Sequence, residues 1–271
     1  MGIFKKEKKT IGLALGGGGV LGAAHVGVLR ALAENNIPID YVSGTSIGAF
    51  VASFVAAGKG WKEIEEIAKQ LKWLDVSKIS FPKMGLLSNK KMGTLLQETI
   101  GDIRFEDTVI PAAMIAADIT NGEKKILKTG DIASAVMAST CIPGIFTPIQ
   151  REGDLLVDGG IVENIPVSPL KDFGADIIIA VDLISHRYIQ KPENIIEVLL
   201  NTFDFMIMNV SKGYAQQADI LITPNLSGAS RVDTDQTPEL IDIGYQTAKD
   251  VLSRDSIRKK LKMIRSGNSK P

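Results

Sequence analysis

The chain has 271 residues, 45% of them apolar and 23% charged, and its acidic and basic side chains balance to a formal net charge of zero. This composition is typical of a globular protein with a sizeable core, and the zero net charge argues against nucleic acid as a partner. Cys141 is the only cysteine, which excludes an intrachain disulfide, and because no apolar run approaches the roughly 18 residues of a membrane span we expect a cytoplasmic protein.

The first half of the chain alternates between predicted strands and predicted helices. Short apolar runs predict buried strands, and apolar residues at helical spacing predict the helices between them. Ser80–Ser88 has neither pattern and is expected to be an irregular loop. The strands are expected at Ile11–Leu15, Ile39–Val42 and Ala112–Ala117, and the helices at Leu21–Glu34, Ile47–Ala57, Trp61–Trp73 and about Met92–Ile100.

The second half of the chain begins with two predicted hairpins. Lys124–Lys128 follows the turn signal Asn121-Gly122 and should pair with the preceding strand, and Asp131 should cap a helix that ends at Ser139. The other elements are a hairpin of Ile145–Ile149 with Leu155–Val157, strands at Ala175–Val181 and Ile220–Thr223, and helices at Glu193–Tyr214 and Pro238–Leu252. This alternation predicts an α/β fold with a mainly parallel central sheet, built as a single domain over residues 1–271.

Ser46 is the strongest candidate for a catalytic residue. It lies in Gly44-Thr45-Ser46-Ile47-Gly48, between a predicted strand and a predicted helix. A sharp turn of this kind needs residues without a Cβ on either side of the serine, and it exposes the serine hydroxyl at the end of a sheet. The helix N-terminus behind the serine favours developing negative charge. The pentapeptide therefore predicts a nucleophile.

Four consecutive glycines, Gly16 to Gly19, follow the first predicted strand. Gly17 to Gly22 matches the G-x-G-x-x-G dinucleotide pattern, but such a site also needs an acidic residue at the end of the second strand. Asp40 lies at the beginning of that strand instead. We therefore favour an oxyanion site, in which glycines turn several backbone N–H groups toward one point. A nucleotide-binding module is the alternative from another functional class.

A serine nucleophile needs a base, and the chain offers three candidates. His25 falls inside the first predicted helix and is expected to be a packed side chain. His186 would complete the chain order of a Ser46–Asp158–His186 triad, but its surroundings are typical of an exposed loop. Asp158 ends an apolar strand and precedes two glycines, so its carboxylate can sit in a pocket lined by backbone and accept the serine proton. Asp158 is the favoured base.

Four segments of the sequence carry a family resemblance. They are Leu13–Gly19 with Ala24–Leu29, Gly44–Ala49, Ala138–Pro148, and Val157–Gly160 with Asn164 and Pro166. In this order they resemble the sequence blocks of patatin-like phospholipases, and they span about Ile11 to Pro169. The resemblance implies a three-layer α/β/α fold with a motif-bearing core at about 11–170. It also implies a lipid acyl-ester hydrolase, such as a phospholipase, lysophospholipase or esterase.

The resemblance assigns roles to the candidate residues. Ser46 would be the nucleophile and Asp158 the base of a dyad that works through an acyl-enzyme, with no metal or organic cofactor. The oxyanion donors would be the N–H groups of Gly17, Gly18, Gly19 and Val20, and the motif would be supported by Gly22, Gly44, Gly48, Gly159 and Gly160. Acyl transfer to an acceptor other than water is an alternative reaction, and a triad with His186 an alternative site.

The chain departs from the family pattern at Leu21, where the family usually has a basic residue. Because oxyanion stabilisation comes from the backbone, hydrolysis should survive this change. The departure argues against a cation at this position that orders the glycine loop or receives a lipid phosphate, so the sequence favours the general class of acyl-ester hydrolases over phospholipases in particular.

A lipid substrate needs an apolar entrance to the site. The irregular segment offers one at Phe81, Pro82, Met84, Leu86 and Leu87, whereas Phe203, Phe205, Met206 and Met208 of the long helix are expected to be ordinary core. The C-terminal helix, at 238–266, is expected to be peripheral. Its last part places Ile257, Leu261 and Ile264 at helical spacing among basic residues, a pattern that can contact an anionic membrane surface.

Overall fold

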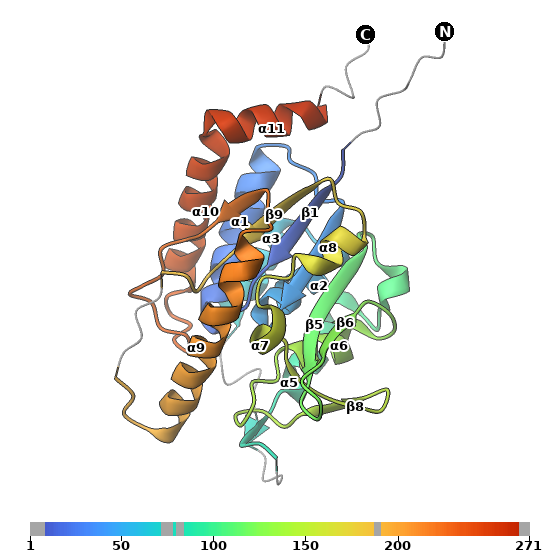
Figure 1. Ribbon diagram of the computed structural model, residues 1–271, viewed down its shortest axis with the longest axis vertical. Helices are drawn as coiled ribbons and strands as arrows, with labels where there is room; N and C mark the ends of the chain where they lie inside the picture. The colour runs from blue at the N-terminus through green and yellow to red at the C-terminus, as the bar shows by residue number, and fades with distance from the viewer. Residues whose placement is uncertain (1–8, 72–77, 80–83, 187–190, 266–271) are drawn as a thin grey trace.

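The computed structural model describes residues 9–71, 78–79, 84–186 and 191–265. A mixed sheet of mostly parallel strands forms its centre (Figure 1). The parallel strands, in spatial order, are β10 (Ile220–Ile222), β9 (Ile177–Val181), β1 (Ile11–Leu15), β2 (Tyr41–Thr45) and β5 (Ala112–Asp118). Three strands run antiparallel to their neighbours: β6 (Lys124–Leu127), β7 (Ile149–Arg151) and β8 (Asp154–Asp158).

Strands β2 and β8 share one side of β5. Ile115 pairs with both β2 and β6, and Ala116 pairs with both β6 and β8, so β2 and β8 both lie opposite β6. The last residue of β2, Thr45, faces Ile115, and the last residue of β8, Asp158, faces Ala116. The two strands run in opposite directions and therefore meet end to end, which brings the residues that follow Thr45 next to Asp158.

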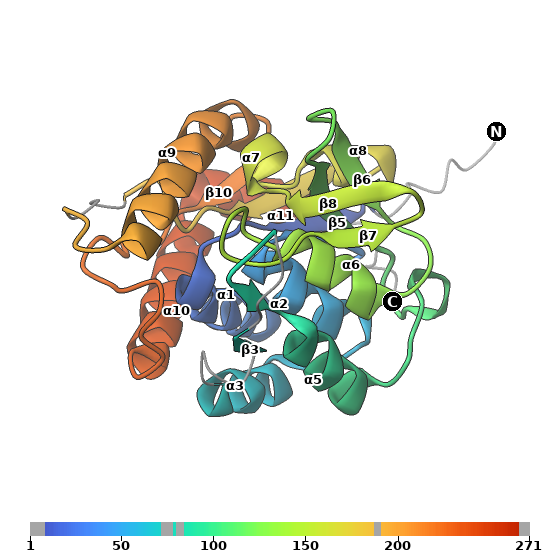
Figure 2. The same cartoon turned by 90° about the horizontal axis from the view of Figure 1, so that it is seen from below.

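Helices cover both faces of the sheet, which gives three layers (Figure 2). Along β1, Ile11, Leu13 and Leu15 belong to the larger core cluster, while Ala14 points into the smaller one on the other face. One face carries α1 (Ala23–Glu34), α2 (Ile47–Ala56), α3 (Trp61–Gln70), α5 (Lys90–Ile100), α6 (Ile132–Ser139) and α10 (Thr237–Ser253). The other carries α7 (Gly160–Glu163), α8 (Ser168–Asp172) and α9 (Ile195–Ala215).

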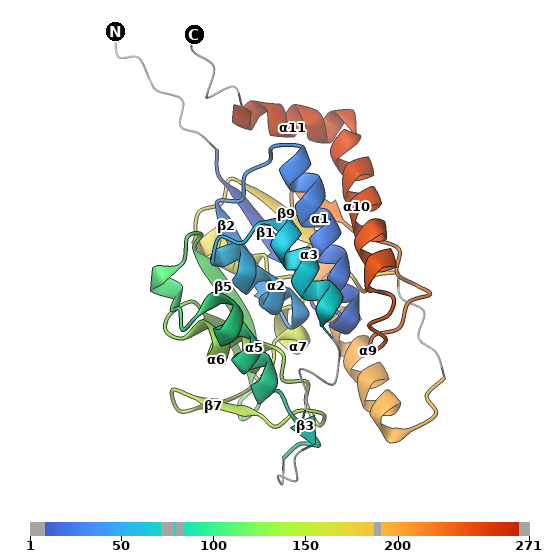
Figure 3. The ribbon, with the colours of Figure 1, turned by 180° about the vertical axis from the view of Figure 1, so that it is seen from behind.

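Helices α1 and α10 lie side by side with their backbones in close approach (Figure 3). A Cβ added to Gly27 of α1 would lie 1.9 Å from the carbonyl oxygen of Ile241, and one added to Gly244 of α10 would lie 2.1 Å from that of Ala24. Only glycine allows two helices to approach this closely. The pair forms the outer layer beside α3, and α11 (Asp255–Arg265) follows α10 at one end of the molecule.

The predicted elements are present, with several shifted boundaries. Strand β2 starts two residues later than expected and runs on to Thr45. Of the expected strand Ile145–Ile149, only Ile149 belongs to β7, because the preceding residues form a turn. A 3-10 turn, Gly19–Gly22, precedes α1. The end of the segment expected to be irregular, Ser80–Ser88, forms strand β4 (Leu87–Ser88), which pairs with β3 (Lys78–Ile79) just before that segment. The sequence pattern did not predict this short ladder.

The expectation for the long helix was wrong for two residues. Phe203 is buried in the core, but Phe205 and Met206 are exposed, because the helix lies on the outside of the sheet and buries one side only. Met84 and Leu86 are also exposed, whereas Trp73, Phe81 and Pro82 lie outside the described residues. In the described part of the chain, no helix combines the length and apolar character needed to cross a bilayer.

Candidate active site

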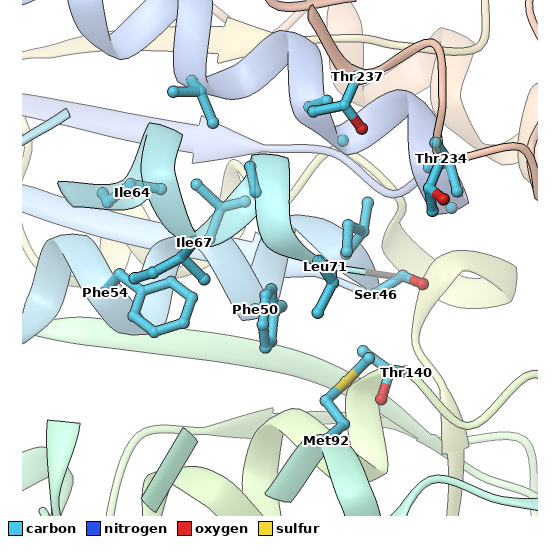
Figure 4. Close-up of a pocket in the computed structure, with 18 of the residues that line it drawn as sticks. Ser46, Phe50, Phe54, Ile64, Ile67, Leu71, Met92, Thr140, Thr234 and Thr237 are labelled. Atoms are coloured by element: carbon cyan, nitrogen blue, oxygen red, sulfur yellow. The ribbon is translucent and has the colours of Figure 1, made fainter. Parts of the chain in front are cut away.

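Ser46 occupies a sharp turn between β2 and α2, as the pentapeptide predicted. Its φ of 56° and ψ of −127° form a conformation that residues with a Cβ rarely adopt. The flanking glycines allow this turn: a Cβ on Gly44 would lie 2.4 Å from the Cα of Ala49, and one on Gly48 would lie 2.0 Å from the carbonyl oxygen of Leu15. The hydroxyl therefore stands at the carboxyl end of the sheet, beside an apolar pocket (Figure 4).

Asp158 is completely buried next to Ser46. Burial raises the pKa of its carboxyl group to about 6, although the Ser46 hydroxyl, the Gly160 N–H and the Arg231 charge each lower it. Oδ1 accepts a hydrogen bond from the Gly160 N–H at 2.8 Å. Oδ2 accepts no hydrogen bond from the described residues, so the Ser46 hydroxyl lies beside the carboxylate without a fully aligned bond to it. Such bonds often tighten only when substrate is bound.

The segment after α6 connects the backbones of both residues. The Ser139 hydroxyl accepts a hydrogen bond from the Ser46 N–H at 2.9 Å, and the Cys141 carbonyl accepts one from the Asp158 N–H at 2.9 Å. The Cys141 thiol donates to the carbonyl of Thr147, and burial, with the nearby Asp158 charge, raises its pKa to about 12. Cys141 is therefore a packed thiol. Ser139 lies in the family segment Ala138–Pro148, but its role in positioning Ser46 was not predicted from the sequence.

The glycine loop between β1 and α1 faces the same point. A Cβ on Gly17 would lie 3.0 Å from the Cβ of Ser46, so the loop and the elbow are in contact. The Gly17 N–H donates to Oδ1 of Asn164 at 3.0 Å, and the Val20 N–H donates to the carbonyl of Arg231 at 3.0 Å. Both groups were expected to be oxyanion donors, and both are already bonded. Within the described part of the chain, this leaves the N–H groups of Gly18 and Gly19 without an acceptor.

The other motif glycines permit close packing around the two residues. A Cβ on Gly22 would lie 2.4 Å from the side chain of Ile47, and one on Gly159 would lie 2.3 Å from the carbonyl oxygen of Ile115. One on Gly160 would lie 3.2 Å from Oδ1 of Asp158. Any larger residue at these positions would move the elbow or the carboxylate.

Neither histidine contacts the dyad. His25 is buried, its Nε2 lies 2.8 Å from the carbonyl oxygen of Gly16, and burial lowers its pKa to about 4. It is therefore a neutral, packed side chain, as predicted. His186 is exposed after β9 and forms no hydrogen bond to Ser46 or Asp158. This geometry favours the dyad over the triad.

The alternative of a nucleotide-binding module needs an acidic residue at the end of the second strand, and Asp40 does not lie there in the structure either. Asp40 accepts a hydrogen bond from the N–H of Ile11, at the amino ends of the strands, while the glycine loop follows the carboxyl end of β1. Among the described residues, no three His, Cys, Asp or Glu side chains gather as metal ligands.

A buried ion pair, which was not predicted from the sequence, contacts the glycine loop. The side chain of Leu21 is buried and apolar, so it supplies no positive charge at the position where the family usually has one. Arg231, from the segment between β10 and α10, packs against Gly19 and pairs with Asp204 of α9. No motif surrounds either residue, and the two are 27 positions apart, so no local pattern predicts the pair.

An apolar cavity opens next to Ser46 and extends between α2, α3 and α5 (Figure 4). The space between its lining residues amounts to about 920 Å³, a volume that includes the open mouth. Its lining includes Phe50, Phe54, Ile64, Ile67, Ala68 and Met92. The cavity can therefore take an unbranched apolar group whose reactive end lies at the serine.

Comparisons with known proteins agree with this arrangement. Residues 13–171 match the family model described as patatin-like phospholipase. The chain is 35% identical to the neuropathy target esterase sws of Drosophila melanogaster and 34% identical to the lysophospholipase NTE1 of Pyricularia oryzae, over 64% and 65% of its length. These matches span only 13% and 12% of the two relatives. Among solved structures, VipD from Legionella pneumophila has a TM-score of 0.54 at 15% identity, with 91% of this chain and 67% of that one covered, which shows a shared fold.

Proposed function

The chain belongs to the patatin-like phospholipase family, and we propose that it hydrolyses the carboxylic esters of lipids with Ser46 as the nucleophile and Asp158 as the base. The observation that carries this proposal is the meeting of the two residues at the carboxyl ends of β2 and β8. The names of the two relatives, an esterase and a lysophospholipase, support the same class of reaction.

The geometry suggests how the first half of the reaction proceeds. Oδ2 of Asp158 takes the proton of the Ser46 hydroxyl while Oγ attacks the ester carbonyl carbon. The carbonyl oxygen becomes negative, and the N–H groups of Gly18 and Gly19 stabilise it. When the intermediate collapses, the ester C–O bond breaks, the alcohol leaves with the proton from Asp158, and the acyl group stays on Ser46.

Water completes the cycle by the same steps in reverse order. Asp158 takes a proton from water, the hydroxide attacks the acyl-enzyme, and the fatty acid leaves as Ser46 regains its proton. Transfer of the acyl group to an alcohol instead of water would use the same residues. The apolar cavity beside Ser46 supports a fatty acyl group as the bound part of the substrate.

A set of three variants tests the dyad with short p-nitrophenyl esters and lysophospholipids. Ser46→Ala should remove turnover, and Asp158→Asn should lower kcat by about 10²–10⁴-fold, because the base is lost. His186→Ala, the matched control, should stay within about twofold of the wild type. Full activity in Ser46→Ala would end the proposal, and loss of activity in His186→Ala would favour the triad.

We further propose that residues 1–271 act as a single domain in the cytoplasm, with contact to a membrane surface through α11. One sheet that receives strands from both halves of the chain supports the single domain. Exposed basic side chains on α11, among them Arg258 and Lys259, support the membrane contact.

A further inference from the structure

The glycine loop is held at both ends by polar groups that lead to α9. At one end, Oδ1 of Asn164 accepts a hydrogen bond from the Gly17 N–H, and Nδ2 of Asn164 donates one to the Ser211 hydroxyl at 3.3 Å. At the other end, Arg231 accepts the Val20 N–H through its carbonyl, and its guanidinium pairs with the Asp204 carboxylate. Asp204 and Ser211 are two turns apart on one buried face of α9.

Arg231 touches the loop with both its backbone and its side chain. A Cβ on Gly19 would lie 2.9 Å from the carbonyl oxygen of Arg231 and 3.4 Å from its Nε. The side chain is 4% exposed and that of Asp204 is fully buried. A buried ion pair stabilises a fold no better, in general, than apolar residues of the same volume. The charge at this position therefore suggests a role in the site beyond packing.

We infer that Arg231 is a positioning residue of the hydrolytic site. Held by Asp204, it fixes the backbone at Gly18 and Gly19, whose N–H groups face the oxyanion, and it places a positive charge beside Asp158. Leu21 occupies the position at which patatin-like phospholipases usually have a basic residue. Arg231, from a distant part of the chain, supplies the positive charge instead. This inference rests on the proposed hydrolysis.

The charges around Asp158 make the inference testable. The groups that influence its carboxylate are the Gly160 N–H, which donates to it, and the Ser46 hydroxyl, the Arg231 charge and the Cys141 thiol, with Asp204 paired to Arg231. Arg231 lowers the pKa of Asp158, so its removal should raise that pKa. Removal of the Asp204 charge should lower it, because the guanidinium is then no longer neutralised. A pair too remote to act on Asp158 would leave this pKa unchanged in both variants, and the loss of kcat then separates a positioning role from a charge that only packs.

The experiment compares kcat, KM and the acid limb of the pH profile for p-nitrophenyl butyrate. Arg231→Met should lower kcat at least 10-fold with KM within threefold, and should move the acid limb to higher pH. Asp204→Asn should move the limb to lower pH, and Arg231→Lys should keep it in place with at least a third of the wild-type kcat. Thermal melts establish that each variant is folded.

A double variant, Arg231→Met with Asp204→Leu, removes the pair without leaving a buried charge. The inference expects this protein to fold and to stay as slow as Arg231→Met. A double variant with wild-type kcat and pH profile would overturn it, because the pair would then serve packing only. Wild-type hydrolysis that disappears in Ser46→Ala establishes the reaction separately. If the wild type hydrolyses nothing, NMR titration of the ¹³C-labelled Asp158 carboxyl decides: opposite shifts in the two single variants support the inference, and equal values overturn it.

Discussion

At the scale of single residues, the site combines two states that cost free energy. Ser46 has a backbone conformation with positive φ, and Asp158 is a carboxyl group without access to water. Each cost is typical of catalytic residues, which the surrounding structure holds in place. Each also gives a measurable consequence.

The activity should depend on the protonation of Asp158. Only the carboxylate can take the serine proton, and its pKa is about 6, so kcat/KM should rise with pH through about 6 and level off above it. The pH profile of p-nitrophenyl butyrate hydrolysis measures this limb. Because a histidine titrates in the same range, the control is His186→Ala, which should keep the limb unchanged. A limb near pH 4 would contradict the buried carboxylate.

The backbone strain at Ser46 should appear in stability. Ser46→Gly relieves the positive φ and Ser46→Ala does not, so the glycine variant should have the higher free energy of unfolding, by about 1 kcal/mol. Ser53, in the middle of α2, is the matched control. There the glycine variant should be less stable than the alanine variant by about 1 kcal/mol, because the helix favours alanine. Urea denaturation measures the free energy of unfolding of all four variants. If alanine is more stable than glycine at both positions, Ser46 is not strained.

At the scale of elements, the groove between α2 and α3 defines the proposed acyl site. Ala68 is a small residue in its lining, so Ala68→Phe should fill part of the groove. We expect kcat/KM for p-nitrophenyl palmitate to fall at least 10-fold, while that for the acetate stays within about twofold, since one blocked apolar contact costs about 1–3 kcal/mol. Gln70→Phe, an exposed change on the same helix, is the control. Equal loss for both esters would place the acyl chain elsewhere.

The contact between α1 and α10 gives a second prediction at this scale. Helix propensity alone predicts that Gly→Ala stabilises by about 1 kcal/mol at Gly27, Gly244 and Gly213. At Gly27 and Gly244 the new methyl group would collide with backbone, so we expect these variants to lose about 2 kcal/mol or more. Gly213 of α9 has nothing within 4 Å and should show the gain. Urea denaturation separates the two outcomes.

The sequence predicted the elements that depend on local pattern. The apolar runs of β1 and β9, the Asp131 cap of α6 and the turn at Asn121-Gly122 are local signals, and each is present in the structure. The extension of β2 to Thr45 was not predicted, because Ser43 and Gly44 have low strand propensity and are held there by pairing with β1 and β5.

The site could be predicted only as far as its motifs extend. Ser46, Asp158 and the glycine loop lie in recognisable segments, and the structure brings them together. Which N–H groups of the loop are free depends on Asn164 and Arg231, whose contacts join residues 147 and more than 200 positions apart. Asn164 lies in a family segment, but nothing in that segment identifies Gly17 as its partner, and Arg231 lies in no motif, so neither contact could be predicted.

At the scale of the whole molecule, α11 lies at one end (Figure 1), whereas the site lies where β2 and β8 end. Lys260 of α11 pairs with Asp219, just before the amino end of β10, at 2.6 Å, whereas Ser46 follows the carboxyl end of β2. A bilayer that binds α11 would therefore face away from the cavity. Membrane contact through α11 suits substrates that reach the site from solution.

The proposed membrane contact of α11 can be measured directly. Truncation after Ser253 should reduce co-sedimentation with vesicles that contain phosphatidylserine by at least fivefold, and hydrolysis of a soluble short ester should change less than twofold. Arg258→Gln with Lys259→Gln removes two exposed charges and keeps the helix, and it should lose about 2 kcal/mol of binding at low salt. Unchanged binding in both proteins would exclude α11 as the contact.

Because α11 is separate from the cavity, this helix is also a suitable point at which to attach the protein to a surface. A molecule anchored to a sensor chip or to a carrier through α11 would present the mouth of its cavity to the flowing solution in a single orientation. Labels placed on the outer side of α11 would report binding without obstructing the entry of substrate. The same geometry would let a neighbouring domain, joined at this end, leave the entrance to the cavity unobstructed.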